Sequence, residues 1–325
     1  MTVLCSTQEA QRPITQPRGS NPAEEVSAGD IVRVDTDLVP VEVTVRDTAG
    51  RAVRGLRKSD FNLFEDGTVR PIGFFSAGSI RGGIPRTINV VFALDVSGSM
   101  KRNEMELLRS TAAALKESLS GPASRFAVIS FGMRVRILQS LTLDQRKLDK
   151  ALDSVVHDVP GLSTHAYDAV DDAVRLLARQ RSKDSDGQVI KRVVILISDG
   201  FPTGDSVTPR TVIECANAAN VSIYTVTMPS FSFNYAAVYG QPLPTILDVS
   251  GLVKETGGVS VYVTDKNYTA ALQAITEEVQ SGYVLAFYPS PEKRRDGNFH
   301  QVRIEARNGL QVNQNRRGYA GKAPR

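Results

Sequence analysis

The chain has 325 residues, of which 41% are hydrophobic and 23% are charged. This balance is ordinary for a globular protein, excludes a disordered or fibrous chain, and leaves room for two domains. The formal net charge is only +4, and no basic stripe indicates nucleic-acid binding. No apolar run approaches the roughly 18 residues of a membrane-spanning helix. Cysteines and histidines are too few and too dispersed for a disulfide framework or a zinc site. They are Cys5, Cys215, His157, His165 and His300.

The N-terminal part of the chain is predicted to change from a tail to strands. Residues 1–30 are polar and carry no apolar period, so we expect a disordered tail, and they contain no recognisable signal peptide. Along residues 39–45 valines alternate with polar residues or Pro40, which is typical of a half-buried strand. Asp66 and Gly67 then predict the turn of a hairpin.

The middle of the chain, residues 88–281, alternates strands with amphipathic helices. Residues 88–94 and 193–197 are near-continuous apolar runs, as expected of parallel strands covered on both faces. A stripe of apolar residues spaced three or four apart begins at Met105 and predicts a helix, and a second stripe begins at Tyr167. Further strands are predicted at 126–131, 135–139, 221–228 and 259–263, and further helices near 209–219, 246–256 and 268–280. This alternation predicts a doubly wound α/β sheet, mostly parallel.

The C-terminal part is again predicted to be β-rich. Residues 283–288 and 302–306 have the composition of strands, and the sequence at 308–309 predicts a turn between strands. The basic groups at 293–295 and 316–317 are expected at hairpin tips exposed to solvent.

The two β-rich ends are each too short for a stable domain of their own. We therefore expect one small β-sandwich made from both ends, with the α/β domain inserted between them; the alternative is two separate β appendages on the sheet. The predicted boundaries are 1–30 for the tail, 31–84 and 282–320 for the two parts of the sandwich, and 85–281 for the inserted domain.

Oxygen-bearing side chains follow the two most apolar strands of the predicted sheet. Asp95, Ser97 and Ser99 come directly after the first strand in the pattern D-x-S-x-S, and Asp199 follows the second. Ligands of open α/β sheets bind beyond the carboxyl ends of the strands, so both carboxylates are expected at one edge. Thr164 lies in a hydroxyl-rich loop before a predicted helix. These residues offer only oxygen donors, which predicts a site for a hard divalent cation such as Mg²⁺.

This constellation resembles the metal-ion-dependent adhesion site of the von Willebrand factor type A domain, which consists of D-x-S-x-S, a threonine and a further aspartate. The resemblance implies that Ser97, Ser99 and Thr164 bind Mg²⁺, Mn²⁺ or Ca²⁺ directly. It also implies that Asp95 and Asp199 act through water. In the alternative interpretation of the first motif, its Asp and Ser side chains only cap the following helix.

The β-rich ends are similar to a bacterial family of proteins related to this domain, which are usually predicted to be exported. The similar stretches are residues 41–66 and 282–288. Export to the periplasm or cell surface is therefore an expectation from resemblance alone. The expected partner is a protein whose exposed Asp or Glu completes the coordination of the metal.

An uncharged insert between residues 229 and 245 contains four aromatic residues and follows a parallel strand, so it leaves from the same edge of the sheet as the metal loops. We expect these side chains to contact the partner; the alternative is that they cover the edge of the sheet. They are Phe231, Phe233, Tyr235 and Tyr239.

Three functions are compatible with the sequence. The leading prediction is a metal-dependent protein-binding module without catalytic residues; the second is a structural subunit whose metal site is vestigial or only stabilising. A metal-dependent hydrolase is third. A phosphatase of the haloacid dehalogenase type needs an acid two residues after Asp95, where Ser97 stands. The sequence also lacks a G-x-S-x-G nucleophile motif and a P-loop.

Overall fold

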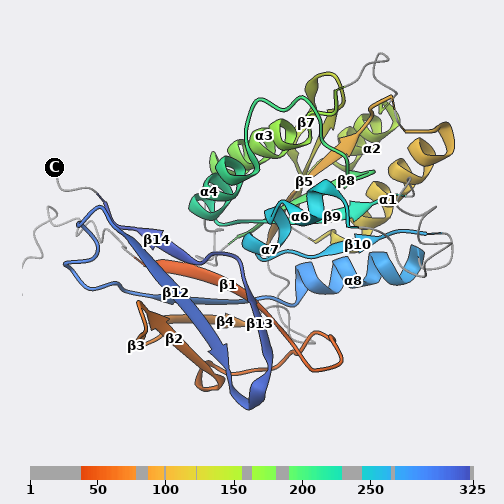
Figure 1. Cartoon of the computed structure of the whole chain (residues 1–325). Coiled ribbons are helices and arrows are strands. Elements are labelled where there is room, and N and C mark those ends of the chain that lie inside the picture. Colours follow the sequence, from red (N-terminus) through yellow and green to blue (C-terminus); the bar gives the residue numbers. More distant parts are fainter. Residues whose placement is uncertain are drawn as a thin grey trace, which may run out of the picture. The chain divides into compact units, whose positions relative to one another are not determined.

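The predicted α/β domain and the predicted β-sandwich both occur in the computed structural model of the chain (Figure 1). The structure describes residues 38–77, 87–98, 100–121, 123–155, 163–180, 190–228, 244–264 and 268–322, which belong to one compact unit. Within this part, no helix has both the length and the apolar character needed to cross a membrane.

A six-stranded sheet forms the centre of the α/β region, in the order β10-β9-β8-β5-β6-β7. All neighbours are parallel except β7, which runs antiparallel to β6. In β5 and β8 every residue is buried, as their continuous apolar sequences predict. The strands are β5 (Ile88–Asp95), β6 (Arg125–Phe131), β7 (Val135–Thr142), β8 (Lys191–Ser198), β9 (Val221–Thr227) and β10 (Ser260–Tyr262).

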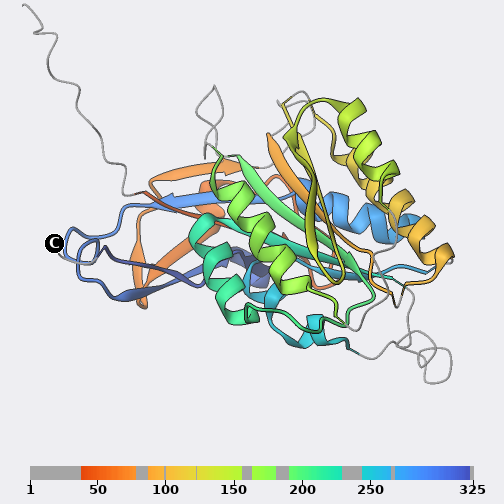
Figure 2. The same cartoon turned by 90° about the horizontal axis from the view of Figure 1, so that it is seen from above.

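Helices cover both faces of this sheet (Figure 2). Helices α1 (Arg102–Leu119), α2 (Gln145–Asp153) and α8 (Tyr268–Gln280) pack on one face. On the other lie α3 (Ala166–Ala178), α4 (Pro209–Ala219), α6 (Ile246–Val249) and α7 (Leu252–Glu255).

Two helices differ from the sequence-based expectation. The helix expected near 246–256 is divided into α6 and α7, because Gly251 between them has φ +80° and interrupts the helix. Helix α2, which the apolar pattern did not reveal, begins after Asp144, whose side chain accepts hydrogen bonds from the backbone of Arg146 and Lys147.

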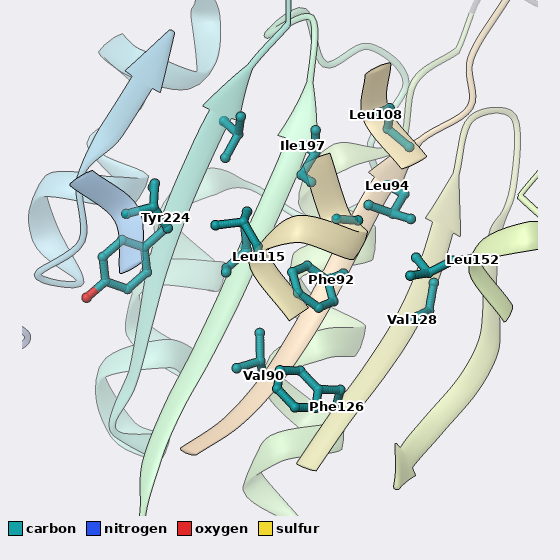
Figure 3. Packing of buried hydrophobic residues seen from close by; sticks show 14 of the residues in the cluster. Val90, Phe92, Leu94, Leu108, Leu115, Phe126, Val128, Leu152, Ile197 and Tyr224 are labelled. Atoms are coloured by element: carbon teal, nitrogen blue, oxygen red, sulfur yellow. The ribbon is translucent and has the colours of Figure 1, made fainter. Parts of the chain in front are cut away.

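The core on the α1 side is formed by alternate residues of the strands. Val90, Phe92 and Leu94 of β5 point to this face, where Leu108 and Leu115 of α1 pack against them (Figure 3). Asp95 has the opposite parity to Leu94, so it belongs to the face covered by α3 and α4. The buried strands therefore fix both the end and the face from which Asp95 projects.

The sandwich consists of two four-stranded sheets, ordered β13-β1-β11-β4 and β14-β12-β2-β3, and each contains strands from both ends of the chain. Apolar residues of the two sheets form one core, in which the Phe61 and Tyr283 rings lie 5.3 Å apart. The predicted hairpin turn is present, with Asp66 and Gly67 at positive φ. The strands are β1 (Val39–Arg46), β2 (Phe61–Glu65), β3 (Thr68–Arg70), β4 (Phe74–Ala77), β11 (Tyr283–Phe287), β12 (Phe299–Ala306), β13 (Gln311–Gln314) and β14 (Gly318–Ala320).

A buried polar seam joins the sandwich to the amino end of the six-stranded sheet. Asn220, just after α4, donates to Glu42 of β1 (2.9 Å) and accepts from Asn315 (2.8 Å). Arg316 donates to the carbonyl of Asn217 and is only 7% exposed. The expectation of a solvent-exposed tip at 316–317 is therefore wrong for Arg316, because its guanidinium is buried in this seam and hydrogen-bonded there.

Candidate metal centre

The carboxyl end of the sheet lies about 25 Å from the seam, the length of an eight-residue strand. Asp95, the last residue of β5, is fully buried there. Its Oδ1 accepts from the backbone N–H of Ser97 (2.9 Å), which bends the chain directly after the strand. Its Oδ2 accepts from Oγ of Ser198 (2.6 Å), the last residue of the neighbouring strand β8. Two strand ends thus hold the Asp95 carboxylate in one orientation.

Asp199 follows Ser198 and is 8% exposed. The turn that carries it is compact: the N–H of Gly200 donates to Ser198 Oγ (3.1 Å), and the N–H of Phe201 donates to Asp199 Oδ1 (3.2 Å). Gly200 has φ +92°, a conformation that residues with a Cβ rarely adopt. The predicted second carboxylate therefore lies at the same edge as Asp95.

The charge of Asp199 acts on the Asp95 carboxylate. Burial, and after it the charge of Asp199, together raise the pKa of Asp95 to about 6, against hydrogen bonds from Ser198 and Ser97 that lower it. None of these groups is a cation. Two buried carboxylates at one edge repel each other, and a positive charge between them would relieve this cost.

Thr164 is brought to the same edge by backbone pairing. It is 7% exposed, and its N–H and C=O pair with those of Thr203 at 2.8 and 3.0 Å. Thr203 lies four residues after Asp199, so this bridge connects the threonine loop to the aspartate loop. The N–H of His165 donates to the carbonyl of Gly132, in the β6–β7 turn. The predicted third loop thus joins the other two.

A polar cluster of His165, Asp168 and Asp205 lies beside Thr164, with potential ligand atoms within 4.8 Å of one another. Burial alone would raise the pKa of Asp168, but hydrogen bonds from His165 and from the backbone of Ser206 and Val207 lower it. Both Asp168 oxygens thus already accept hydrogen bonds, and the cluster fastens the loop after Asp199 to the start of α3.

Four of the five predicted ligands lie at one edge of the sheet: Asp95 ends β5, and Ser97, Thr164 and Asp199 lie in the loops there, while their role as ligands stays a prediction. Ser97 is 3% exposed. Ser99 lies outside the described residues, as do the four aromatic residues at 231–239, so their predicted roles stay predictions. Sequence reasoning missed Ser198 and Thr203. Their positions beside Asp199 are visible in the sequence, but their partners come from other strands and loops.

Comparison with known proteins agrees with this architecture. Residues 89–280 match the family model described as the von Willebrand factor type A domain. No curated protein sequence matches the chain.

Solved structures similar to this chain are distant in sequence. Proximal thread matrix protein 1 of the mussel byssus is 17% identical with a TM-score of 0.46, over 62% of this chain and 47% of that one. A further structure of that protein has a zinc-occupied MIDAS motif, at 17% identity and a TM-score of 0.47, again over 62% of this chain and 47% of that one. BatB of Bacteroides thetaiotaomicron is 18% identical with a TM-score of 0.41, over 59% of this chain and 97% of that one.

This chain spans about half the length of the mussel protein. The family model, by contrast, covers more than half of this chain and includes the strands that carry Asp95 and Asp199. The chain therefore belongs to the von Willebrand factor type A domain family.

Proposed function

We propose that the chain is a metal-dependent protein-binding module. In this proposal Ser97, Ser99 and Thr164 bind a divalent cation through their hydroxyl oxygens, and Asp95 and Asp199 bind it through water. The observation that carries the proposal is the pair of buried carboxylates at the ends of neighbouring strands: Asp95 ends β5, and Asp199 directly follows β8.

The residues fit a hard cation better than a soft one. The proposed donors are carboxylate and hydroxyl oxygens, the ligands preferred by Mg²⁺, Mn²⁺ and Ca²⁺. Hydroxyls carry no formal charge, so a site built on Ser97, Ser99 and Thr164 leaves the cation able to accept a further acidic ligand. An Asp or Glu of a partner protein supplies that ligand in this proposal. The chain's own part is to orient the oxygen donors and to bury them at the sheet edge.

Metal binding is tested by thermal melting of the wild type and of Asp95→Ala, first in EDTA and then with millimolar Mg²⁺, Mn²⁺ or Ca²⁺. A cation that binds only the folded state raises the melting temperature. We expect a rise in the wild type that Asp95→Ala abolishes. No rise with any of the three cations would contradict the proposal and favour a structural subunit with a vestigial site.

The partner carboxylate is tested with a library of displayed random peptides, captured on the wild type in Mg²⁺ and released with EDTA. Peptides that also bind Asp95→Ala are discarded. We expect each remaining peptide to contain an Asp or Glu whose change to Asn or Gln abolishes capture. Metal-dependent stabilisation without any EDTA-released peptide would instead indicate a cation with a purely stabilising role.

A further inference from the structure

A second polar network, formed by Thr245, Asp248 and Tyr262, contacts the loop that carries Asp199. Oδ2 of Asp248 accepts from the backbone N–H and from Oγ1 of Thr245, both at 2.7 Å, which caps the first turn of α6. Tyr262, the last residue of β10, donates its phenol hydrogen to the same Asp248 oxygen. Burial and the Asp248 carboxylate raise the pKa of Tyr262, so the phenol stays protonated and remains a donor.

This network contacts the Asp199 loop at Gly200. The N–H of Leu247 donates to the Gly200 carbonyl at 3.4 Å. The Thr245 side chain, only 1% exposed, packs on the Gly200 backbone so closely that a Cβ at position 200 would lie 2.5 Å from Thr245 Cγ2. Gly200 is therefore fixed in place by the first turn of α6.

Helix α6 does not have the length to hold this position by itself. It contains four residues, Ile246–Val249, far fewer than an isolated helix needs for stability. Tyr262 supplies the missing anchor, because its backbone belongs to the sheet through the pairing of β10 with β9 at Thr227. Consecutive contacts therefore connect the sheet to the Asp199–Gly200 turn, through Tyr262, Asp248 and Thr245.

We infer that Tyr262, Asp248 and Thr245 are positioning residues for the metal centre: by holding the Asp199–Gly200 turn, they set its affinity for the cation. This inference rests on the proposed function, since it assigns a supporting shell to the proposed ligand Asp199. Supporting residues of this kind orient ligands without touching the metal.

The test is calorimetric titration of Mg²⁺ into the whole chain, with melting in EDTA measured on the same samples. The variants are Tyr262→Phe and Asp248→Asn, which keep side-chain shape while weakening the hydrogen bonds. Tyr283→Phe is the matched control. Its hydroxyl donates to Val53 O (2.9 Å) and accepts from Leu56 N–H (3.2 Å) within the sandwich, so it loses comparable bonds far from the metal edge.

We expect the Kd for Mg²⁺ to rise about threefold to tenfold in Tyr262→Phe and in Asp248→Asn. In Tyr283→Phe we expect a lower melting temperature in EDTA with an unchanged Kd. A lower melting temperature with unchanged Kd in Tyr262→Phe would overturn the inference, because that result describes a purely structural role.

Two further outcomes are informative. If Tyr262→Phe does not fold, Thr245→Ser replaces it: this change keeps the hydroxyl and removes the methyl group nearest Gly200, and an unchanged Kd would again overturn the inference. If the wild type binds no Mg²⁺, Mn²⁺ or Ca²⁺, the proposed function fails and this inference fails with it. Binding by the wild type with equal Kd in all variants defeats only the inference.

Discussion

Buried charged side chains have different interactions at the two ends of the six-stranded sheet. At the amino end, the cationic Lys191 and Arg192 and the anionic Glu278 are all less than 9% exposed, and each has partners within the chain. At the carboxyl end, Asp95 and Asp199 are equally buried, but the charge that acts on Asp95 most strongly has the same sign. Buried charges of opposite sign can stabilise each other within the chain, whereas two buried charges of like sign would be stabilised by an external cation.

The amino-end seam shows how balance is achieved. Arg192 donates to the carbonyls of Ala219 (2.8 Å), the last residue of α4, and of Gln180 (2.6 Å), which lies just after α3. A cation at these helix ends satisfies carbonyls that have no partner within the helix and interacts favourably with the helix dipoles. The Glu278 carboxylate in α8 accepts hydrogen bonds from Thr44 Oγ1 and from the Arg46 guanidinium, each at 2.6 Å. Thr44 and Arg46 both belong to β1. Glu278 therefore joins the α/β domain to the sandwich, whereas Arg192 connects helix ends within the α/β domain.

The largest effect is expected from Glu278→Ala, which breaks the balance at the seam. The change leaves Arg46 and Thr44 without their carboxylate in a site where Glu278 is only 1% exposed. Removal of Glu278 should cost about 2 kcal/mol of unfolding free energy, less than for a fully buried pair, because the Arg46 side chain is 29% exposed. Urea denaturation measures this loss. The neighbouring exposed residue provides the control: Glu277→Ala should change the unfolding free energy by less than about 0.5 kcal/mol. Equal effects of the two changes would refute the seam's structural role.

A smaller effect, of opposite sign, is expected from Asp95→Asn in EDTA. Removing the charge relieves its burial and its repulsion with Asp199, while one accepted hydrogen bond is lost, so the net gain should be about 1–2 kcal/mol. In saturating Mg²⁺ the wild type should recover stability and Asp95→Asn should not. Denaturation with and without metal tests whether the order of the two proteins inverts. A less stable Asp95→Asn in EDTA would show that the two carboxylates are balanced by groups within the chain.

The carboxyl end could be predicted from the sequence because its signals are local. The apolar runs of β5 and β8 identify buried parallel strands, and whatever follows such strands lies at one edge, so Asp95 and Asp199 follow directly. The supporting groups could not be predicted in this way. Tyr262 reaches Asp248 only because β10 pairs with β9, and Thr245 looks like an ordinary helix cap in the sequence.

The amino-end seam was beyond sequence reasoning for the same reason. Glu278 and Arg46 lie 232 positions apart in the chain, and nothing in either local pattern indicates the other. Arg316 illustrates the cost: a basic pair near the C-terminus looks like a solvated turn, yet burial lowers the pKa of Arg316 to about 10 because its guanidinium lies inside the seam. Alternation and apolar runs therefore predict elements and edges, whereas charge pairing depends on the tertiary contacts.

A third cluster of charged residues lies at the surface of the sandwich. Both ring nitrogens of His300 face carboxylates: Nδ1 is 2.8 Å from Asp66 and Nε2 is 2.9 Å from Asp296. Lys293 also donates to Asp66 at 2.7 Å, and the Tyr319 ring lies 5.2 Å from the imidazole. This cluster ties β12 to the β2–β3 turn. Its charges are balanced like those of the seam but are closer to solvent.

The smallest effect is expected from the titration of His300. Burial lowers its pKa, but the hydrogen bonds that the imidazole makes to the Asp66 and Asp296 carboxylates, with their charges, outweigh burial and raise the pKa above the ordinary value of 6.5. A raised folded-state pKa means that the stabilisation is complete below about pH 6.5 and is lost as the pH rises through the folded-state value. The pKa of Asp66 is lowered to about 2, so its own contribution disappears only in strong acid, as the pH falls from 3.8 to that value. In EDTA, His300→Gln should therefore reduce the unfolding free energy more at pH 6 than at pH 9, by less than about 1 kcal/mol. An equal reduction at both pH values would mean that His300 acts through packing on Tyr319 and not through its charge.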